Sequence, residues 1–304
     1  MKTFLLFSIR FFVGAIFLLS GLLKLYPIEP FELNFIDLGV ANWQSAPFLA
    51  RGIIGLEIFL GLALIFMQGN QKRVLIWTIG VLLFFSMYLV VQILKDDHGD
   101  CGCFGTYLSM TPKESLVKNL ALILMSFAVM KEGRAFNWRF SKIINISLLI
   151  LSFTLPHVLN PIDLISARNL NVEATSFALD VDLINDNAMS STWEGDLAEG
   201  KHVVAFLSMT CAHCRTTALK MHVLKKENPE FSFLMVLNGK IDKLSDFLAD
   251  TRSDNLPLLR LSADPFSKLT GGRVPLIVFV NDGEVQRILK LPELNNKELT
   301  SLLN

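Results

Sequence analysis

The chain has 304 residues, of which 52% are apolar, and its mean hydropathy is +0.46. That length suits about two domains, and this hydropathy excludes an ordinary soluble protein. Its 28 basic and 28 acidic side chains cancel, so the chain lacks the basic excess typical of a nucleic-acid-binding protein. Long apolar runs fill the sequence up to about residue 160, and charged residues are regularly interspersed beyond it. We therefore expect a membrane part followed by a water-exposed part.

Five apolar segments are candidate membrane spans, because a helix needs roughly 20 mainly apolar residues to cross the hydrocarbon core. They are residues 4–26, 48–67, 74–94, 115–130 and 143–159. The last two are the shortest, and their alternative interpretation is a buried helix of a soluble protein. The first is too long in its apolar region for a signal peptide and lacks a small-residue cleavage site, so we interpret it as a retained span.

The loop charges favour a cytoplasmic N-terminus, since Lys and Arg are enriched in short cytoplasmic loops. With five spans, Lys2, the pair Lys72-Arg73 and the basic cluster within 131–142 fall on one side. The opposite loops spread their basic residues over about twice the length and mix them with Asp and Glu. An odd number of spans places the C-terminal part outside. We predict a multi-pass protein of a bacterial inner membrane with a periplasmic, extracytoplasmic C-terminal domain.

All four cysteines occur in two closely spaced pairs, Cys101-Gly-Cys103 and Cys211-Ala-His-Cys214. Because no cysteine is left over, the pairs indicate two redox-active dithiols rather than a structural framework. The predicted topology places both pairs on the extracytoplasmic face, where disulfides persist. No cysteine lies in a predicted span or cytoplasmic loop, which argues against electrons being carried across the membrane from a cytosolic thiol protein.

The C-terminal part alternates between strand-like and helical patterns. We expect strands at 202–208, 231–237 and 276–280, helices at 215–226, 240–251 and 296–303, and a hairpin at the Asn281-Asp282-Gly283 turn. The C-x-x-C motif ends the first of these strands and opens a helix, and Pro275 directly precedes the last one. This arrangement resembles the thioredoxin superfamily. The resemblance implies an α/β thioredoxin-like fold with a cis-proline at Pro275, beside the C-x-x-C.

Cys211 is the expected nucleophile of this motif. A cysteine at a helix N-terminus faces unpaired backbone N–H groups and the positive end of the helix dipole, which favour the thiolate. Cys214, one turn further on, is the expected resolving thiol. Ala212 and His213 lie between them, and His213 before the second cysteine resembles the oxidising members of the superfamily. Ala205 stands where thioredoxin has a buried acid, and the absence of that acid favours oxidation or isomerisation over reduction.

Three motifs mark the membrane part: Arg10-x-x-x-Gly14-x-x-Phe17-x-x-Ser20-Gly21-x-x-Lys24-Leu25, Gly55-x-Glu57 and Cys101-Gly-Cys103-Phe104-Gly105. On these motifs, residues 1–133 resemble the DoxX/MauE superfamily of small four-helix membrane proteins. MauE (methylamine utilisation) proteins are implicated in disulfide maturation of a periplasmic dehydrogenase subunit, and DoxD relatives belong to thiosulfate:quinone oxidoreductases. The resemblance implies a transmembrane bundle of four helices. A fifth helix and linker at 134–165 would tether a thioredoxin-like domain at 166–304.

The Cys101–Cys103 pair is predicted to accept electrons. A disulfide within C-x-C closes a very small ring and is expected to be strained and easily reduced, with Gly102 supplying backbone freedom. The alternatives are a reduced loop, a fixed structural disulfide, and a metal site that includes His98. For Cys211 and Cys214 the alternative is half of a zinc site, which the absence of a second C-x-x-C disfavours. We predict no metal.

Arg10 and Glu57 fall within predicted spans, where charged groups are costly and usually paired. We expect a structural ion pair between them. The alternative is a role in quinone binding or proton delivery.

Together these patterns predict a membrane-bound thiol-disulfide oxidoreductase. Cys211–Cys214 would oxidise the thiols of exported client proteins and pass the electrons to Cys101–Cys103. A membrane acceptor such as a quinone would then reoxidise that second pair. Two alternatives stay open, namely a disulfide reductase or isomerase, and an assembly factor that captures one periplasmic client without turnover. The predicted partners are client proteins, the lipid bilayer and a quinone.

Overall fold

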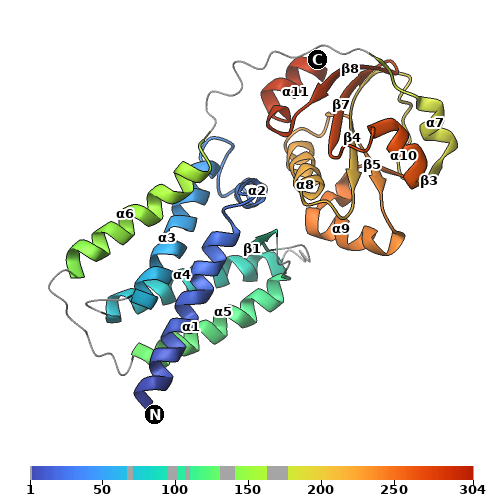
Figure 1. Ribbon diagram of the computed structural model, residues 1–304. Helices are drawn as coiled ribbons and strands as arrows, with labels where there is room; N and C mark the ends of the chain where they lie inside the picture. The colour runs from blue at the N-terminus through green and yellow to red at the C-terminus, as the bar shows by residue number, and fades with distance from the viewer. Residues whose placement is uncertain are drawn as a thin grey trace. The chain divides into compact units, whose positions relative to one another are not determined.

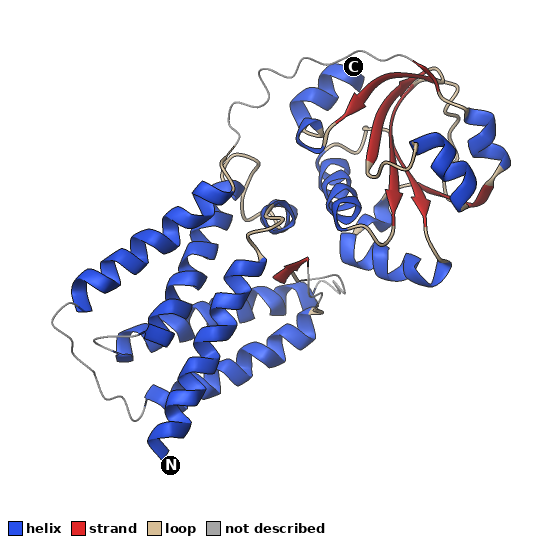
Figure 2. Cartoon of the chain, in the orientation of Figure 1, coloured by secondary structure: helices blue, strands red, loops and turns tan. Residues whose placement is uncertain are grey.

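A computed structural model describes residues 2–66, 71–94, 101–106, 110–130, 141–162 and 177–303. The chain divides into two compact units, Met1–Ile162 and Asp163–Asn304. The first unit is helical and the second is built on a sheet flanked by helices (Figures 1 and 2). This arrangement confirms the predicted fold class. His98, the basic residues within 131–140 and most of the predicted linker lie outside the described residues.

The helical unit contains a bundle of four helices with a fifth on its outside. Its elements are α1 (Lys2–Leu23), α2 (Glu29–Asp37), α3 (Ala46–Phe66), α4 (Gln71–Leu94), β1 (Cys103–Thr106), α5 (Pro112–Met130) and α6 (Ser141–Leu159). One apolar core joins α1, α3, α4 and α5, with Val13, Leu64, Leu75 and Leu122 among its buried members. Helix α6 packs against α3. The core therefore explains why four helices form one body and α6 lies beside it.

Three helices of the described residues are long and apolar enough to cross a membrane: Phe4–Leu23, Ala46–Phe66 and Lys72–Leu94. They correspond to the first three predicted spans. Helix α5 carries Lys113, Glu114 and Lys118 near its start, and the apolar stretch of α6, Ile143–Leu159, is shorter. Large apolar side chains such as Phe11, Trp77, Leu124 and Ile150 are exposed on the outside of these helices. Such a surface suits contact with lipid tails.

Small residues set the register between α1 and α3, which run in opposite directions. A Cβ atom added to Gly61 would lie 2.7 Å from the backbone N of Leu18 and 2.8 Å from the carbonyl O of Gly14. A Cβ atom on Gly21 would lie 2.8 Å from Cγ1 of Ile58. The backbones can approach this closely only because the side chains are absent. This contact places the C-terminal turn of α1 beside the middle of α3.

The second unit contains one seven-stranded sheet in the order β2-β8-β7-β4-β5-β6-β3. Its strands are β2 (Phe177–Ala178), β3 (Ala188–Ser191), β4 (Lys201–Ser208), β5 (Phe233–Asn238), β6 (Leu258–Leu261), β7 (Leu276–Asn281) and β8 (Glu284–Leu289). Its helices are α7 (Val181–Asp186), α8 (Ala212–Glu227), α9 (Leu244–Thr251), α10 (Ala263–Thr270) and α11 (Asn296–Leu303). Strands β4, β5 and β6 are parallel, and β7 runs antiparallel to β4.

Strand β4 lies at the centre of this sheet and is buried on both faces. Phe206 packs in a core with Ile184 of α7 and Phe266 of α10, while α8 and α11 lie on the opposite face (Figure 1). The β4-α8-β5 crossover followed by the antiparallel pair β7-β8 is the thioredoxin topology that the sequence predicts. Strands β3 and β6 and helices α7 and α10 were not predicted, and the expected helix at 240–251 begins as a 3-10 turn.

The helix contact at Gly61 yields a stability prediction. Gly61→Ala should lower the free energy of unfolding by about 1–3 kcal/mol, because the new methyl group overlaps the backbone of α1. Gly52→Ala is the matched control on the same helix, since nothing lies within 4 Å of its added Cβ. It should be neutral or stabilise by up to about 1 kcal/mol through helix propensity. Thermal unfolding in detergent micelles measures both, and equal effects would contradict the glycine contact.

Candidate redox sites

The C-x-x-C motif joins the buried strand β4 to helix α8. Cys211 is the residue that caps α8, with extended backbone angles of φ −88° and ψ 125°, and its side chain is half-buried. Cys214 lies in the first turn of α8 and is completely buried. Its Sγ accepts a hydrogen bond from the backbone N–H of Ser208 at 3.3 Å. One thiol is therefore reachable from solvent and the other is enclosed.

Burial raises the pKa of the Cys214 thiol to about 12, against the opposing effect of the Ser208 N–H. Cys214 therefore remains protonated near neutral pH, which suits the resolving role that the sequence predicts. Ala212 and His213 are both exposed. Ala205 is fully buried in β4, so the position of thioredoxin's buried acid is apolar in this fold.

Pro275 lies at the same end of the sheet as the C-x-x-C. The Val274–Pro275 peptide bond is cis, as the thioredoxin resemblance implies. Strand β7 begins at the next residue, Leu276, which pairs with Phe206 of β4. This register places Pro275 level with the end of β4 that leads into Cys211.

The C-x-C motif forms a tight loop held against α1 and α2. Gly102 and Gly105 have φ angles of +67° and +63°. An added Cβ on Gly102 would lie 2.6 Å from Nδ2 of Asn34, and one on Gly105 would lie 2.5 Å from the carbonyl O of Leu23. Both positions therefore favour glycine for conformation, and Gly105 also requires it for space, because its neighbour is backbone. The loop can fold over the end of α1 only with this sequence.

The two thiols of this loop differ sharply in their environment. Cys101 is buried, and its Sγ lies 3.0 Å from Oγ of Ser115. A hydrogen bond to Cys103 and burial both raise the pKa of Cys101. The same hydrogen bond lowers the pKa of Cys103 to about 6, and the positive charges of Lys118 and Lys24 act in the same direction. Cys103 is thus the thiolate of the pair, and Cys101 is the thiol that donates to it.

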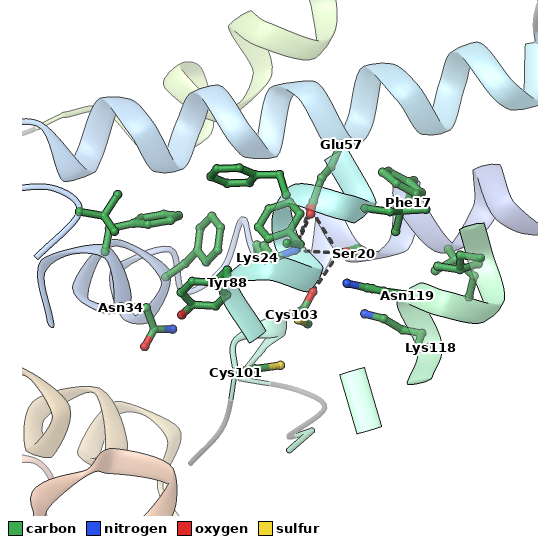
Figure 3. A pocket seen from close by; sticks show the side chains of 18 residues that line it. Phe17, Ser20, Lys24, Asn34, Glu57, Tyr88, Cys101, Cys103, Lys118 and Asn119 are labelled. Atoms are coloured by element: carbon green, nitrogen blue, oxygen red, sulfur yellow. Dashed lines mark hydrogen bonds and ion pairs between the residues drawn. The ribbon is translucent and has the colours of Figure 1, made fainter. Parts of the chain in front are cut away.

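A buried ion pair between Lys24 and Glu57 holds the C-x-C loop through Ser20. Nζ of Lys24 donates to Oε1 and Oε2 of Glu57 at 2.9 and 2.8 Å, and to Oγ of Ser20 at 2.7 Å. The Ser20 hydroxyl lies 2.8 Å from the carbonyl O of Cys103 and 3.3 Å from Glu57. Because a hydroxyl has one proton, Ser20 accepts from Lys24 and donates to the closer oxygen, that of Cys103. Figure 3 shows this chain of contacts.

The expected ion pair between Arg10 and Glu57 is therefore wrong, because Glu57 pairs with Lys24. The α1–α3 register explains the difference, since Gly21 faces Glu57 while Arg10 lies about three turns earlier on α1. The guanidinium of Arg10 instead lies 5.3 Å from the ring centre of Phe7. Its Nε is buried without a hydrogen-bond partner among the described residues.

A cavity opens beside Cys101 and Cys103, with an empty volume of about 790 Å³ that includes space open to solvent. Its aromatic lining comes from Phe17, Phe31, Phe35, Phe84, Phe85 and Tyr88. Its polar lining comes from Ser20, Lys24, Asn34, Glu57, Lys118 and Asn119. This mixture of aromatic walls and a few polar groups is typical of small-molecule sites. In Figure 3, Asn34 and Tyr88 lie on one side of the cysteines, and Lys118 and Asn119 lie on the other.

Sequence reasoning missed most of this cavity. It gave no separate role to the lining residues Lys24, Lys118, Ser20, Asn34, Tyr88 and Asn119. One signal was present, because Ser20 and Lys24 are four residues apart and so share a helix face in the motif that also holds the glycines. Among the described residues, no group of three or more His, Cys, Asp or Glu side chains gathers to hold a metal ion.

The three motifs of the membrane part fall within one region of family similarity. Residues 1–131 match the family model of the methylamine utilisation protein MauE. The N-terminal part is therefore similar to MauE over these residues. Protein TlpB of Flavobacterium psychrophilum is 23% identical in an alignment that covers 94% of this chain and 91% of TlpB. The similarity to TlpB therefore extends over both units.

Two solved structures are similar to part of this chain. DsbF of MTB is 18% identical, with 40% of this chain and 96% of that chain covered and a TM-score of 0.33. The thioredoxin domain of a thiol-disulfide oxidoreductase from Bacteroides vulgatus is 13% identical. That comparison covers 45% of this chain and 100% of the domain, with a TM-score of 0.33.

The asymmetry between the C-x-C thiols yields a pH prediction. In a Cys211→Ser/Cys214→Ser background, iodoacetamide should alkylate Cys103 at a rate that rises with pH through a midpoint near pH 6, because the thiolate is the nucleophile. Cys101 should stay unmodified over the same range, since its pKa is raised. Peptide mapping by mass spectrometry gives the two rates separately.

The matched pair of variants for this experiment lies on α5. Lys118→Met removes a positive charge that favours the thiolate, so the midpoint for Cys103 should move to higher pH. Lys113→Met changes an exposed lysine of the same helix and should leave the profile in place. Faster alkylation of Cys101 than of Cys103 would refute the assignment.

Proposed function

We propose that this protein oxidises the thiols of exported proteins and passes their electrons to a quinone in the membrane. Cys211–Cys214 would exchange disulfides with the client, and Cys101–Cys103 would reduce the quinone. The observation that carries the proposal is the aromatic-lined cavity that opens onto the C-x-C thiols in the MauE-like part. A redox-active pair beside a site for a flat apolar molecule is the arrangement that this transfer needs.

The first two steps are disulfide exchanges. A client thiolate attacks Sγ of Cys211 in the Cys211–Cys214 disulfide, and the sulfur of Cys214 leaves and takes up a proton. A second client thiolate then releases Cys211, so the client gains a disulfide and the domain holds a dithiol. That dithiol reduces the Cys101–Cys103 disulfide in the same way, through a mixed disulfide. Each exchange moves two electrons and needs no bound metal or prosthetic group.

The third step restores the C-x-C disulfide. Two electrons and two protons leave Cys101 and Cys103 and reduce one quinone to one quinol. Cys103 is partly exposed and can exchange with Cys211, whereas Cys101 is buried and the cavity beside the pair has aromatic walls that favour an apolar acceptor.

The relay requires both pairs on one side of the membrane, and the end of α6 supports this. Nδ2 of Asn160, directly after α6, donates to the carbonyl O of Leu25 at 2.8 Å, and the carbonyl of Asn160 accepts from Nε of Arg51 at 2.9 Å. Leu25 follows Lys24, which belongs to the C-x-C site. The chain therefore leaves the helical unit at the same end of the bundle as Cys103. In the proposed topology this end is periplasmic and the N-terminus is cytoplasmic.

Attachment of the two pairs to one chain raises their effective concentration for each other, to the order of millimolar for a short flexible linker. A transient collision then suffices for exchange, and a permanent docking surface is unnecessary.

Thiol trapping in cells tests the direction of the proposed flow. Acid quenching followed by maleimide labelling should show Cys211–Cys214 mostly oxidised in the wild type. Cys101→Ser blocks the relay, so Cys211–Cys214 should accumulate mostly in the reduced form in that variant. Lys113→Met serves as the control, because this exposed side chain belongs to neither pair nor to the cavity lining.

Each other result would contradict the proposal in a specific way. A mostly reduced Cys211–Cys214 pair in the wild type would indicate a reductase or isomerase. A single client held as a lasting mixed disulfide would indicate an assembly factor without turnover. An unchanged oxidised fraction in Cys101→Ser would show that the two pairs do not exchange electrons.

A further inference from the structure

Within the proposed quinone reduction, we infer that Cys103 is the sulfur that attacks the quinone and that Lys118 is a catalytic residue that receives the negative charge on the quinone oxygen. Cys101 then closes the disulfide. This inference rests on the proposed function and assigns a separate task to each thiol and to one lysine.

Helix α5 serves both thiols from one face. Ser115 and Lys118 are three residues apart and therefore neighbours on the helix surface. Oγ of Ser115 lies 3.0 Å from Sγ of Cys101. Nζ of Lys118 lies 4.3 Å from the ring centre of Phe104, the residue after Cys103, and Lys118 also lines the cavity. One helix thus provides a neutral hydroxyl to the protonated thiol and an ammonium group to the region of the thiolate.

The charges around Cys103 explain why Lys118, and not Lys24, receives the negative charge on the quinone oxygen. Lys24 also faces the cavity, but both oxygens of Glu57 lie within 2.9 Å of its ammonium group. That ion pair is neutral as a unit and holds the loop through Ser20. The charge of Lys118 balances the thiolate of Cys103, whose pKa it helps to lower. When the thiolate charge moves into the ligand, this ammonium group remains beside the cavity to receive it.

The reaction proceeds in two steps, in which atoms, electrons and protons balance. The thiolate of Cys103 adds to a ring carbon of the quinone, and the displaced electron pair moves to the carbonyl oxygen, which Lys118 protonates. Sγ of Cys101 then attacks Sγ of Cys103, the S–S bond forms, and the breaking C–S bond returns its electron pair to the ring. The proton of Cys101 goes to the second oxygen. The products are a disulfide and a quinol. Lys118 is then reprotonated from water, which took up the proton that Cys103 lost when it ionised.

Preorganised charge next to a developing oxyanion accelerates a reaction by about 10²–10³-fold. A cation that only filled space in the cavity wall would affect binding of the quinone instead. The distinction between a rate effect and a binding effect therefore separates a catalytic lysine from a structural one.

The test uses the full chain in detergent with Cys211→Ser/Cys214→Ser, so that only the C-x-C pair can react. The reduced protein is mixed anaerobically with a short-chain ubiquinone, and quinol formation is followed by absorbance. Each chain forms one quinol, so the single-turnover rate constant is measured against quinone concentration. Lys118→Met should lower its value at saturating quinone about 10²-fold, with a smaller change in the half-saturating concentration. Lys118→Arg should recover at least part of the rate, and the exposed control Lys113→Met should match the background.

Covalent trapping tests the role of each thiol. With Cys101→Ser, the S–S bond cannot form, so a quinone adduct should accumulate on Cys103 and be visible by mass spectrometry. With Cys103→Ser, no adduct should form on Cys101. Equal saturating rate constants in Lys118→Met and the background, or an adduct on Cys101, would overturn the inference while leaving quinone reduction intact. A background protein that forms no quinol would overturn the proposed acceptor step itself.

Discussion

The buried ion pair between Lys24 and Glu57 is the interaction on which the redox site of the membrane part depends. Charged side chains in a low-dielectric environment are costly unless they are paired and hydrogen-bonded. Here the pair exists because Gly14, Gly21 and Gly61 let α1 and α3 approach until the end of α1 meets the middle of α3. Ser20 extends the network to the backbone of Cys103. The register between α1 and α3 therefore also fixes the position of Cys103.

Each cysteine pair combines one protonated thiol with one more accessible sulfur, by different physical means. In the C-x-x-C, burial is the main cause that keeps Cys214 protonated, while Cys211 lies at the N-terminus of α8. In the C-x-C, one thiol donates a hydrogen bond to the other, and two lysines favour the ionised partner. The first environment is suited to exchange with protein thiols, and the second to transfer into the aromatic-lined cavity.

The sequence was sufficient where local patterns decide the structure. The C-x-x-C after an apolar strand and the Asn281-Asp282-Gly283 turn predict the thioredoxin-like sheet, and the C-G-C-F-G stretch predicts a MauE-like domain. The partner of Glu57 could not be predicted in the same way, because it depends on how far α1 slides along α3. That offset is set by contacts at three glycines, which a count of residues from the ends of predicted spans does not capture. The cavity was missed for the same reason, since its walls come from α1, α2, α3, α4 and α5 together.

We propose that electrons pass from Cys211–Cys214 through Cys101–Cys103 to a quinone. The most direct test counts the quinol formed by the fully reduced chain, diluted anaerobically into excess short-chain ubiquinone in detergent. Four thiols make two dithiols, so the account predicts two quinols per chain. It predicts one for Cys211→Ser/Cys214→Ser and none for Cys101→Ser/Cys103→Ser. One quinol from the wild-type chain, with Cys211–Cys214 left reduced, would contradict the relay.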